Sequence, residues 1–355
     1  MQNHHHCFRK SFRWPLLLAL CLFSTLLCAE PRLDVVEFSS RALRNNPLKD
    51  PIVRRLAIFL PSQATHQMPI PVVYYLPGYR GSSESYIKGS EKWLAYVQKL
   101  ADQQMPVLLV IGDCRTHWGG SQYLNSPAQG NYDDYISKEI VSLVETRHPK
   151  IASRKHRIIA GHSSGGFGAL RLGMRHRSTF EGVIALAPDS DFQLSHLPIV
   201  QSAAVTNLTL SYVKKLMALD PMTPLPKESD GVYTLGLSAA YAPRGRFHPG
   251  QFEWPYDEDG CFRPKIWQRW MNHDPLTLAL RNPHIFSARQ SVYLEGSSED
   301  KFLANVGARK IYEAIRGNPA RSVFYEPPGK HSDHVPERLE RGIAWFFGKP
   351  LRDIP

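Results

Sequence analysis

The sequence predicts an α/β protein in which helices cover both faces of a mostly parallel, doubly wound sheet. Short apolar runs, most of them followed closely by Gly, Pro or an acidic residue, alternate along the chain with longer amphipathic stretches. This alternation is typical of parallel strands joined by right-handed crossover helices. The chain has 355 residues, of which 43% are apolar and 21% charged, so it is long enough to bury one large core.

Two kinds of strand are expected. In Val35–Ser40 and Val53–Leu60 apolar and polar residues alternate, which predicts half-buried antiparallel strands that form an edge hairpin. Continuous apolar runs instead predict strands covered on both faces. These runs are Val72–Leu76, Val107–Ile111, Arg157–Ala160, Val183–Leu186, Val292–Leu294 and Val323–Tyr325.

Helices are expected between the strands, at Glu91–Gln103, Asp133–His148, Ser164–His176, Glu299–Ile315 and Pro336–Phe347. Residues 189–284 break the alternation because they are rich in Pro, Gly and aromatic residues. We interpret them as a cap-like insertion within a single domain of residues 30–355. Their aromatic residues, in Tyr241–Pro243, Trp254–Tyr256 and Trp267–Trp270, are expected to form either a hydrophobic binding wall or the core of the insertion itself.

The first 29 residues are predicted to be a secretory signal peptide. Basic residues precede an apolar run from Trp14 to Cys28, and the small residue Ala29 precedes a charged segment. The run is shorter than the roughly 20 residues of a membrane-spanning helix, which favours cleavage over an uncleaved anchor, and the bulky Leu27 argues against a lipoprotein. We therefore expect an exported protein, periplasmic or secreted, with no stable membrane span after cleavage. The sequence leaves its oligomeric state open.

Charge and cysteine content exclude several classes of partner. The formal net charge is +11, and +8 once Arg9, Lys10 and Arg13 of the leader are removed. Basic residues form only short pairs, so we expect no nucleic-acid partner.

Cys114 and Cys261 are the cysteines of the mature chain, and they either form one disulfide or remain separate thiols. Because the chain contains neither C-x-x-C nor H-E-x-x-H, we expect no metal and no cofactor.

The segment Gly161-His162-Ser163-Ser164-Gly165-Gly166 carries the strongest chemical signal. It lies between an expected strand and an expected helix, the context required by the nucleophile elbow of an α/β-hydrolase fold. The glycines permit the sharp turn that presents a serine hydroxyl at the edge of the sheet. Ser163 is therefore the expected nucleophile.

A serine hydroxyl needs a histidine base and a carboxylate that orients the histidine, and in this fold the chain order is Ser, acid, His. His331 follows the last expected strand and is the predicted base, with His334 as its competitor. The loop after Val292–Leu294 offers three carboxylates. Asp300 is the predicted acid because a helix is expected to begin directly after it, and Glu299 and Glu295 remain alternatives.

An oxyanion hole needs two backbone N–H groups, one from the residue after the nucleophile and one from an earlier loop. The first is predicted at Ser164. The second is predicted at Tyr79, which follows the strand Val72–Leu76 in the loop Pro77-Gly78-Tyr79.

From Leu56 to Phe347 the chain resembles the family of esterase D and S-formylglutathione hydrolase, which also includes siderophore esterases and mycobacterial mycolyltransferases. The residues that carry this resemblance are Tyr75–Tyr79, Gly119–Pro127 with Gly130 and Tyr132, Gly161–Arg171, Asp300–Phe302 and Gly329–His331. The resemblance implies an α/β-hydrolase fold, a relay of Ser163, His331 and Asp300, an oxyanion hole at Tyr79 and Ser164, and carboxylester substrates.

The resemblance also suggests that Trp118, Gly120 and Tyr123 line the acyl side of the cleft, although a structural role is an equal alternative. The chain departs from some relatives at Pro77 and at Ser332-Asp333. These departures weaken any transfer of sugar or mycolate specificity.

The predicted function is an exported serine carboxylesterase whose substrate is a small-molecule or lipid ester. It would transfer an acyl group to Ser163 and then to water. Two alternatives remain: an acyltransferase that uses the same acyl-enzyme, and a catalytically silent binding protein on the same fold.

Overall fold

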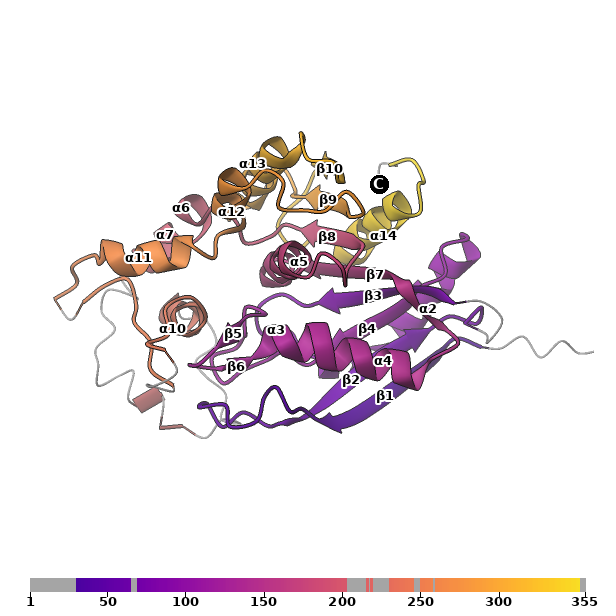
Figure 1. Cartoon of the computed structure of the whole chain (residues 1–355), viewed down its shortest axis with the longest axis horizontal. Helices are drawn as coiled ribbons and strands as arrows, with labels where there is room; N and C mark the ends of the chain where they lie inside the picture. Colours follow the sequence, from indigo (N-terminus) through magenta and orange to yellow (C-terminus); the bar gives the residue numbers. More distant parts are fainter. Residues whose placement is uncertain are drawn as a thin grey trace, which may run out of the picture.

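The structure, a computed structural model, describes residues 30–64, 69–202, 215–216, 218–219, 230–245, 250–257 and 259–351. Its main element is an eight-stranded sheet in the order β1-β2-β4-β3-β7-β8-β9-β10 (Figure 1). The strands are β1 (Arg32–Ser39), β2 (Val53–Leu60), β3 (Ile70–Leu76), β4 (Leu108–Gly112), β7 (Ala152–His162), β8 (Gly182–Leu186), β9 (Ser291–Glu295) and β10 (Arg321–Tyr325). A separate two-stranded sheet pairs β5 (Asn125–Ser126) with β6 (Gly130–Asn131).

Strand direction follows the expected pattern. β1 pairs antiparallel with β2, and β2 pairs antiparallel with β4. All the other neighbours in the sheet, from β4 across to β10, pair in parallel. The edge hairpin and the mostly parallel sheet are confirmed. The carboxyl ends of the parallel strands therefore meet at one edge, which is where ligands bind in open α/β sheets.

Helices cover both faces of the sheet. They are α1 (Ser83–Lys88), α2 (Ser90–Asp102), α3 (Tyr132–Asp134), a π-helix (Tyr135–Ile140), α4 (Val141–Arg147), α5 (Ser164–Arg175), α6 (Phe192–Ser195), α7 (Leu197–Val200), α10 (Asp230–Tyr241), α11 (Pro264–Met271), α12 (Pro275–Arg281), α13 (Ala304–Ile315) and α14 (Val335–Phe346). One core cluster packs α4, α5 and α13 against the sheet, and a second packs α2 and α14 against it. Neighbouring residues of β2 alternate between the clusters: Ile58 belongs to the first and Phe59 to the second.

One expected helix begins later than predicted. We expected a helix from Glu299, but α13 begins at Ala304. The Asp300 carboxylate accepts a hydrogen bond from the backbone N–H of Phe302 at 2.8 Å, and Leu303 adopts the left-handed region at φ 56°. The five residues before α13 therefore form a turn that positions Asp300, rather than the first turn of a helix.

The insertion, residues 189–284, lies between β8 and β9. Figure 1 shows its helices α6, α7, α10 and α11 gathered beyond the arrowheads of the parallel strands. Tyr241, Trp267 and Trp270 are buried together with Phe167 of α5. These aromatic rings are therefore part of a packed core that joins the insertion to the sheet layer.

Three further expectations concern the leader, membrane-spanning helices and the two cysteines. The predicted leader, residues 1–29, lies outside the described residues. Among the residues that are described, no helix is both long enough and apolar enough to cross a membrane. Cys114 is buried and Cys261 is exposed, and both are free thiols, so of the two alternatives the structure has separate cysteines.

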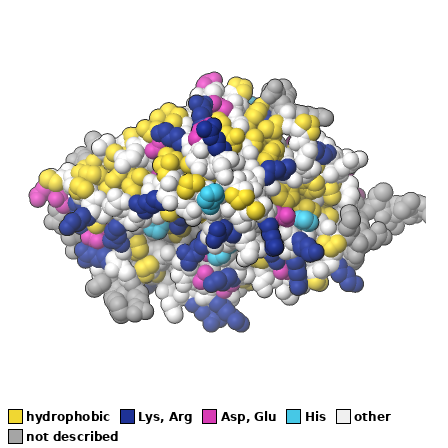
Figure 2. Space-filling model, turned by 45° about the horizontal axis from the view of Figure 1, so that its top comes forward, with side chains coloured by type: hydrophobic (Ala, Val, Ile, Leu, Met, Phe, Trp, Pro, Cys, Tyr) yellow, Lys and Arg dark blue, Asp and Glu magenta, His cyan; other side chains and the backbone are white. Residues whose placement is uncertain are grey.

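Surface charge is dispersed on the face drawn in Figure 2. Lys and Arg side chains are scattered there, with Asp and Glu side chains between them and hydrophobic patches beside them. This agrees with the spacing of basic residues along the sequence.

Candidate active site

Ser163 lies in a strained turn at the carboxyl end of β7. Its backbone adopts φ 58° and ψ −122°, and α5 begins at the next residue. A Cβ added to Gly165 would lie 1.8 Å from the carbonyl oxygen of Leu76, and one added to Gly161 would lie 2.2 Å from the carbonyl oxygen of Gly165. Only glycine fits at both positions, because the turn presses β7, α5 and the end of β3 together. The predicted elbow geometry is present.

His331 and Asp300 come together from the loops that follow β10 and β9. The imidazole Nδ1 of His331 donates to Asp300 Oδ2 at 2.6 Å. Burial acts to raise the pKa of Asp300, but the hydrogen bond from His331 and those from the backbone N–H groups of Phe302 and Ala304 outweigh it and hold this pKa below 3.8. The carboxylate is therefore ionised at neutral pH and orients the imidazole.

The alternative acids and the alternative histidine occupy other environments. Glu295 is fully buried and accepts from Arg338 Nε at 2.5 Å. Glu299 is exposed, and its backbone N–H donates to the carbonyl of Gly329 at 2.9 Å. His334 is exposed at the N-terminus of α14, with φ 51°. Of the carboxylates considered, the structure pairs Asp300 with the predicted base.

Two further side chains hold the backbone of His331 against the elbow. The imidazole Nε2 of His162 donates to the carbonyl oxygen of His331 at 2.8 Å, and the two rings lie 4.8 Å apart. Arg338 donates to the same carbonyl at 3.0 Å. Burial lowers the pKa of His162 to about 3, so this histidine is neutral near pH 7 and donates as a neutral imidazole. His331 thus lies beside the nucleophile loop although it is distant in sequence.

The two predicted oxyanion donors flank Ser163. Ser164 is the first residue of α5, so its N–H has no acceptor within the helix. The loop after β3 reaches the elbow from the other side, since a Cβ on Gly78 would lie 3.5 Å from Ser163 Cβ. Tyr79 follows directly, and its hydroxyl donates to the carbonyl of Trp118.

The residues predicted to line the acyl side lie behind the Tyr79 loop. Trp118 is fully buried, and its ring packs 6.0 Å from that of Phe252. Tyr123 is also buried and donates to the carbonyl of Pro77. Gly120 allows the Tyr79 ring to approach its backbone, because a Cβ there would lie 2.7 Å from Tyr79 Cδ2. These residues support the loop that carries Tyr79.

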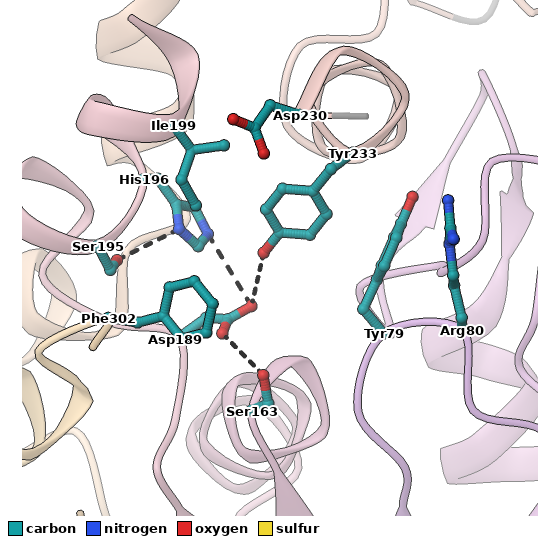
Figure 3. Close-up of a pocket in the computed structure, with 10 residues that line it drawn as sticks. All are labelled: Tyr79, Arg80, Ser163, Asp189, Ser195, His196, Ile199, Asp230, Tyr233 and Phe302. Atoms are coloured by element: carbon teal, nitrogen blue, oxygen red, sulfur yellow. Dashed lines mark hydrogen bonds and ion pairs between the residues drawn. The ribbon is translucent and has the colours of Figure 1, made fainter. Parts of the chain in front are cut away.

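A cavity of about 350 Å³ opens beside Ser163 (Figure 3). Its lining residues are Tyr79, Arg80, Ser163, Asp189, Ser195, His196, Ile199, Asp230, Tyr233 and Phe302. The Ser163 hydroxyl donates to Asp189 Oδ1 at 3.4 Å. In the part of the chain that the structure describes, no group of three or more His, Cys, Asp or Glu side chains is arranged to hold a metal ion.

Asp189 and His196 line this cavity, and neither is among the site residues predicted from the sequence. A signal for Asp189 was present, because it follows the apolar strand Val183–Leu186 by three residues and therefore lies at the carboxyl edge of the sheet. The sequence holds no comparable signal for His196, whose position depends on the fold of the insertion.

The strand order of the sheet and the turn at Ser163 define the α/β-hydrolase fold. The chain belongs to the esterase family described as "Putative esterase", which matches residues 53–337. It is thus a member of a family of carboxylic ester hydrolases, which agrees with the predicted resemblance.

Among curated proteins, an acetyl esterase of Caldicellulosiruptor saccharolyticus is 28% identical over 116 residues, which are 32% of this chain and 40% of that protein. The chain therefore spans less than half the length of this relative. Among solved structures, an S-formylglutathione hydrolase from Agrobacterium tumefaciens has a TM-score of 0.57 at 17% identity, over 91% of this chain and 97% of the other. A ferulic acid esterase has a TM-score of 0.56 at 15% identity, over 89% and 97%. These likenesses establish the fold.

Proposed function

We propose that the protein is an exported serine carboxylesterase that works through an acyl-enzyme on Ser163. The observation that carries this proposal is the strained serine at the carboxyl end of β7, whose neighbour His162 is hydrogen-bonded to a histidine that donates through Nδ1 to a buried carboxylate at 2.6 Å. A serine, histidine and carboxylate arranged in this way are the parts that acyl transfer requires.

The acylation step moves one proton and one acyl group. His331 Nε2 accepts the proton of the Ser163 hydroxyl while Oγ forms a bond to the ester carbonyl carbon. The bond from this carbon to the alcohol oxygen then breaks, and Nε2 gives the proton to the departing alcohol. In deacylation, water attacks the same carbon, His331 accepts a proton from the water, and Ser163 recovers its proton as the carboxylic acid leaves.

The supporting groups have separate roles in this proposal. Asp300 keeps a proton on Nδ1 and stabilises the imidazolium that forms. The N–H groups of Tyr79 and Ser164 stabilise the negative charge on the carbonyl oxygen. His162 and Arg338 are positioning residues, because each donates to the backbone carbonyl of His331.

A fluorophosphonate probe and a series of p-nitrophenyl esters of graded chain length test the proposal. We expect the probe to label the wild type, and Ser163→Ala to lose both labelling and hydrolysis. Ser85→Ala is the matched control, since Ser85 is an exposed serine of α1. Labelling of Ser163→Ala equal to that of the wild type would show that another residue is the nucleophile. Product analysis with an added alcohol separates the esterase from an acyltransferase.

Export is part of the same proposal and rests on the sequence of residues 1–29. Expression of the full chain in a bacterial host with an intact secretion pathway, followed by N-terminal sequencing of the extracytoplasmic fraction, tests it. We expect a mature protein that begins near Glu30. An uncleaved chain in the cytoplasmic fraction would contradict this expectation.

A further inference from the structure

A second group of polar side chains lies in the cavity next to Ser163. None of the roles proposed above for acyl transfer belongs to this group. Asp189 Oδ2 accepts from the Ser164 hydroxyl at 2.8 Å, from the Tyr233 hydroxyl at 3.4 Å and from Gln122 Nε2 at 3.5 Å. Its other oxygen, Oδ1, accepts from Ser163 at 3.4 Å. Figure 3 shows this carboxylate between Ser163 on one side and Tyr233 and His196 on the other. The acyl-transfer steps leave Asp189 without a function.

His196 is the second member of this group. Only 2% of its surface is exposed, yet it lines the cavity. Its Nδ1 lies 3.2 Å from the Ser195 hydroxyl oxygen, while its Nε2 is buried and has no hydrogen-bond partner among the residues that the structure describes. Nε2 lies 4.0 Å from Asp189 Oδ2, which is too far for a direct hydrogen bond. A buried polar atom without a partner is unfavourable, and this one faces a space that a ligand can enter.

The chemistry of the two groups defines what fits between them. Burial lowers the pKa of His196, so its imidazole is neutral. The adjacent carboxylate favours the tautomer that carries its proton on Nε2, because the N–H dipole then points at negative charge. The pair therefore offers one donor, His196 Nε2, and one acceptor, Asp189 Oδ1, whose bond from Ser163 is long at 3.4 Å and which keeps a lone pair for a ligand. A hydroxyl group satisfies both because it donates and accepts, whereas an ammonium group only donates.

We propose that Asp189 and His196 form a subsite for a hydroxyl group on the acyl part of the ester substrate. The inference rests on the proposed function, because it takes Ser163 as the attacking group. The leaving alcohol must lie beside His331, which protonates it, and this leaves the side of Asp189 for the acyl part. Since Asp189 Oδ1 is 3.4 Å from Ser163 Oγ, the recognised hydroxyl is on carbon 2 or 3 of the acyl chain.

The remaining cavity wall limits the length of that chain. Ile199, Phe302 and the ring of Tyr233 line the same space, and the volume of about 350 Å³ is at the lower end for a ligand site. The substrate class is therefore an ester of a short 2- or 3-hydroxy acid.

The experiment compares p-nitrophenyl butyrate with its 2-hydroxy, 3-hydroxy and 3-amino derivatives. We expect kcat/KM for one hydroxy ester to exceed that for butyrate by about tenfold or more, as expected for a hydrogen bond to a charged group. His196→Phe and Asp189→Asn should each remove this preference. His196→Phe keeps an aromatic ring stacked on Phe192, 4.3 Å away in the wild type.

Asp230→Asn is the matched control, since it removes a second carboxylate from the lining of the same cavity. It should keep the hydroxyl preference. Fluorophosphonate labelling of each variant shows that the elbow is folded, so a lost preference in a labelled variant supports the subsite.

The experiment distinguishes failure of the subsite proposal from failure of the proposed function. If the wild type is labelled and hydrolyses butyrate but shows no hydroxyl preference, the subsite is wrong and the proposed function stands. Preference for the amino ester would overturn the hydroxyl assignment. A wild type that neither labels nor hydrolyses any of the esters would overturn both proposals.

Discussion

The imidazole of His162 donates to the backbone carbonyl of His331 at 2.8 Å, although 169 residues separate the two histidines. This hydrogen bond joins the residue before the proposed nucleophile to the proposed base. Because burial lowers the pKa of His162 to about 3, the donor stays neutral over the pH range in which an esterase works. The bond is therefore independent of pH in that range.

Loss of this bond should impair turnover. We expect His162→Phe to lower kcat by between about ten- and a hundred-fold, because a small displacement of a catalytic group has a large effect on rate. KM should change little. His162→Gln, whose amide can donate to the same carbonyl, should recover part of the loss. Steady-state kinetics with p-nitrophenyl butyrate provide the measurement, and a glutamine variant as impaired as the phenylalanine variant would contradict the positioning role.

Asp300→Asn should lower kcat/KM by roughly 10³- to 10⁴-fold, because the amide no longer fixes the tautomer of His331. Glu299→Gln is the control: Glu299 is the neighbouring residue in the chain and is exposed, and its removal should leave kcat/KM within about twofold. Equal losses in both variants would show that the net charge of the loop, rather than the hydrogen bond to His331, is what matters.

Gly165→Ala should destabilise the protein strongly. The added methyl group would lie 1.8 Å from the carbonyl oxygen of Leu76, and relieving such overlap costs about 1–3 kcal/mol or more. At Gly317 a Cβ would meet nothing within 4 Å, so Gly317→Ala should change the free energy of unfolding by less than about 1 kcal/mol. Urea unfolding followed by circular dichroism compares the two, and equal stability of both variants would exclude the close packing at the elbow.

Arg338→Met should lower the free energy of unfolding by about 3–5 kcal/mol, because it leaves the fully buried Glu295 without the guanidinium that contacts it at 2.5 Å. Arg309→Met breaks an exposed pair with Glu326 and should cost no more than about 1 kcal/mol. Chemical denaturation measures both. A loss of less than about 1 kcal/mol in Arg338→Met would mean that Arg341, which also contacts Glu295, compensates fully.

Asp50 should make stability depend on pH. Burial raises its pKa from 3.8 to about 7, and its buried Oδ2 has no hydrogen-bond partner within the described part of the chain. Between these pH values the folded state binds a proton that the unfolded state has lost, so stability should fall as pH rises from about 4 to 7. Asp50→Asn removes this contribution, and it should be more favourable relative to wild type at pH 8 than at pH 5.

The control for this prediction is Asp102→Asn, at an exposed aspartate of α2. Its difference from the wild type should be the same at both pH values. Urea unfolding at pH 5 and pH 8 provides the four comparisons. A pH-independent effect of Asp50→Asn would contradict the raised pKa.

The sequence predicted the parallel strands well because the central ones are short apolar runs that tertiary packing covers on both faces. It predicted the elbow and the pairing of His331 with Asp300 because the chemistry requires a fixed chain order. The predicted helix start at Glu299 was wrong. The helical pattern of the sequence extends over residues that form a turn in the structure. The turn forms because the Asp300 carboxylate binds the N–H of Phe302, a local competition that periodicity does not reveal.

The π-helix at Tyr135–Ile140 and the Asp189–His196 pair could not be predicted from the sequence either. The first depends on how one wide turn packs against the sheet, and an amphipathic pattern does not distinguish it from an α-helix. The second joins the end of β8 to α6 and α7, two short helices within the insertion. No spacing rule connects residues whose proximity is decided by that packing.

The proposed reacting groups and most residues of the cavity wall come from different parts of the chain. Ser163, Asp300 and His331 follow strands of the sheet, whereas six of the ten lining residues belong to the insertion: Asp189, Ser195, His196, Ile199, Asp230 and Tyr233. A different insertion in place of residues 189–284 would therefore change the wall of the cavity without replacing Ser163, Asp300 or His331.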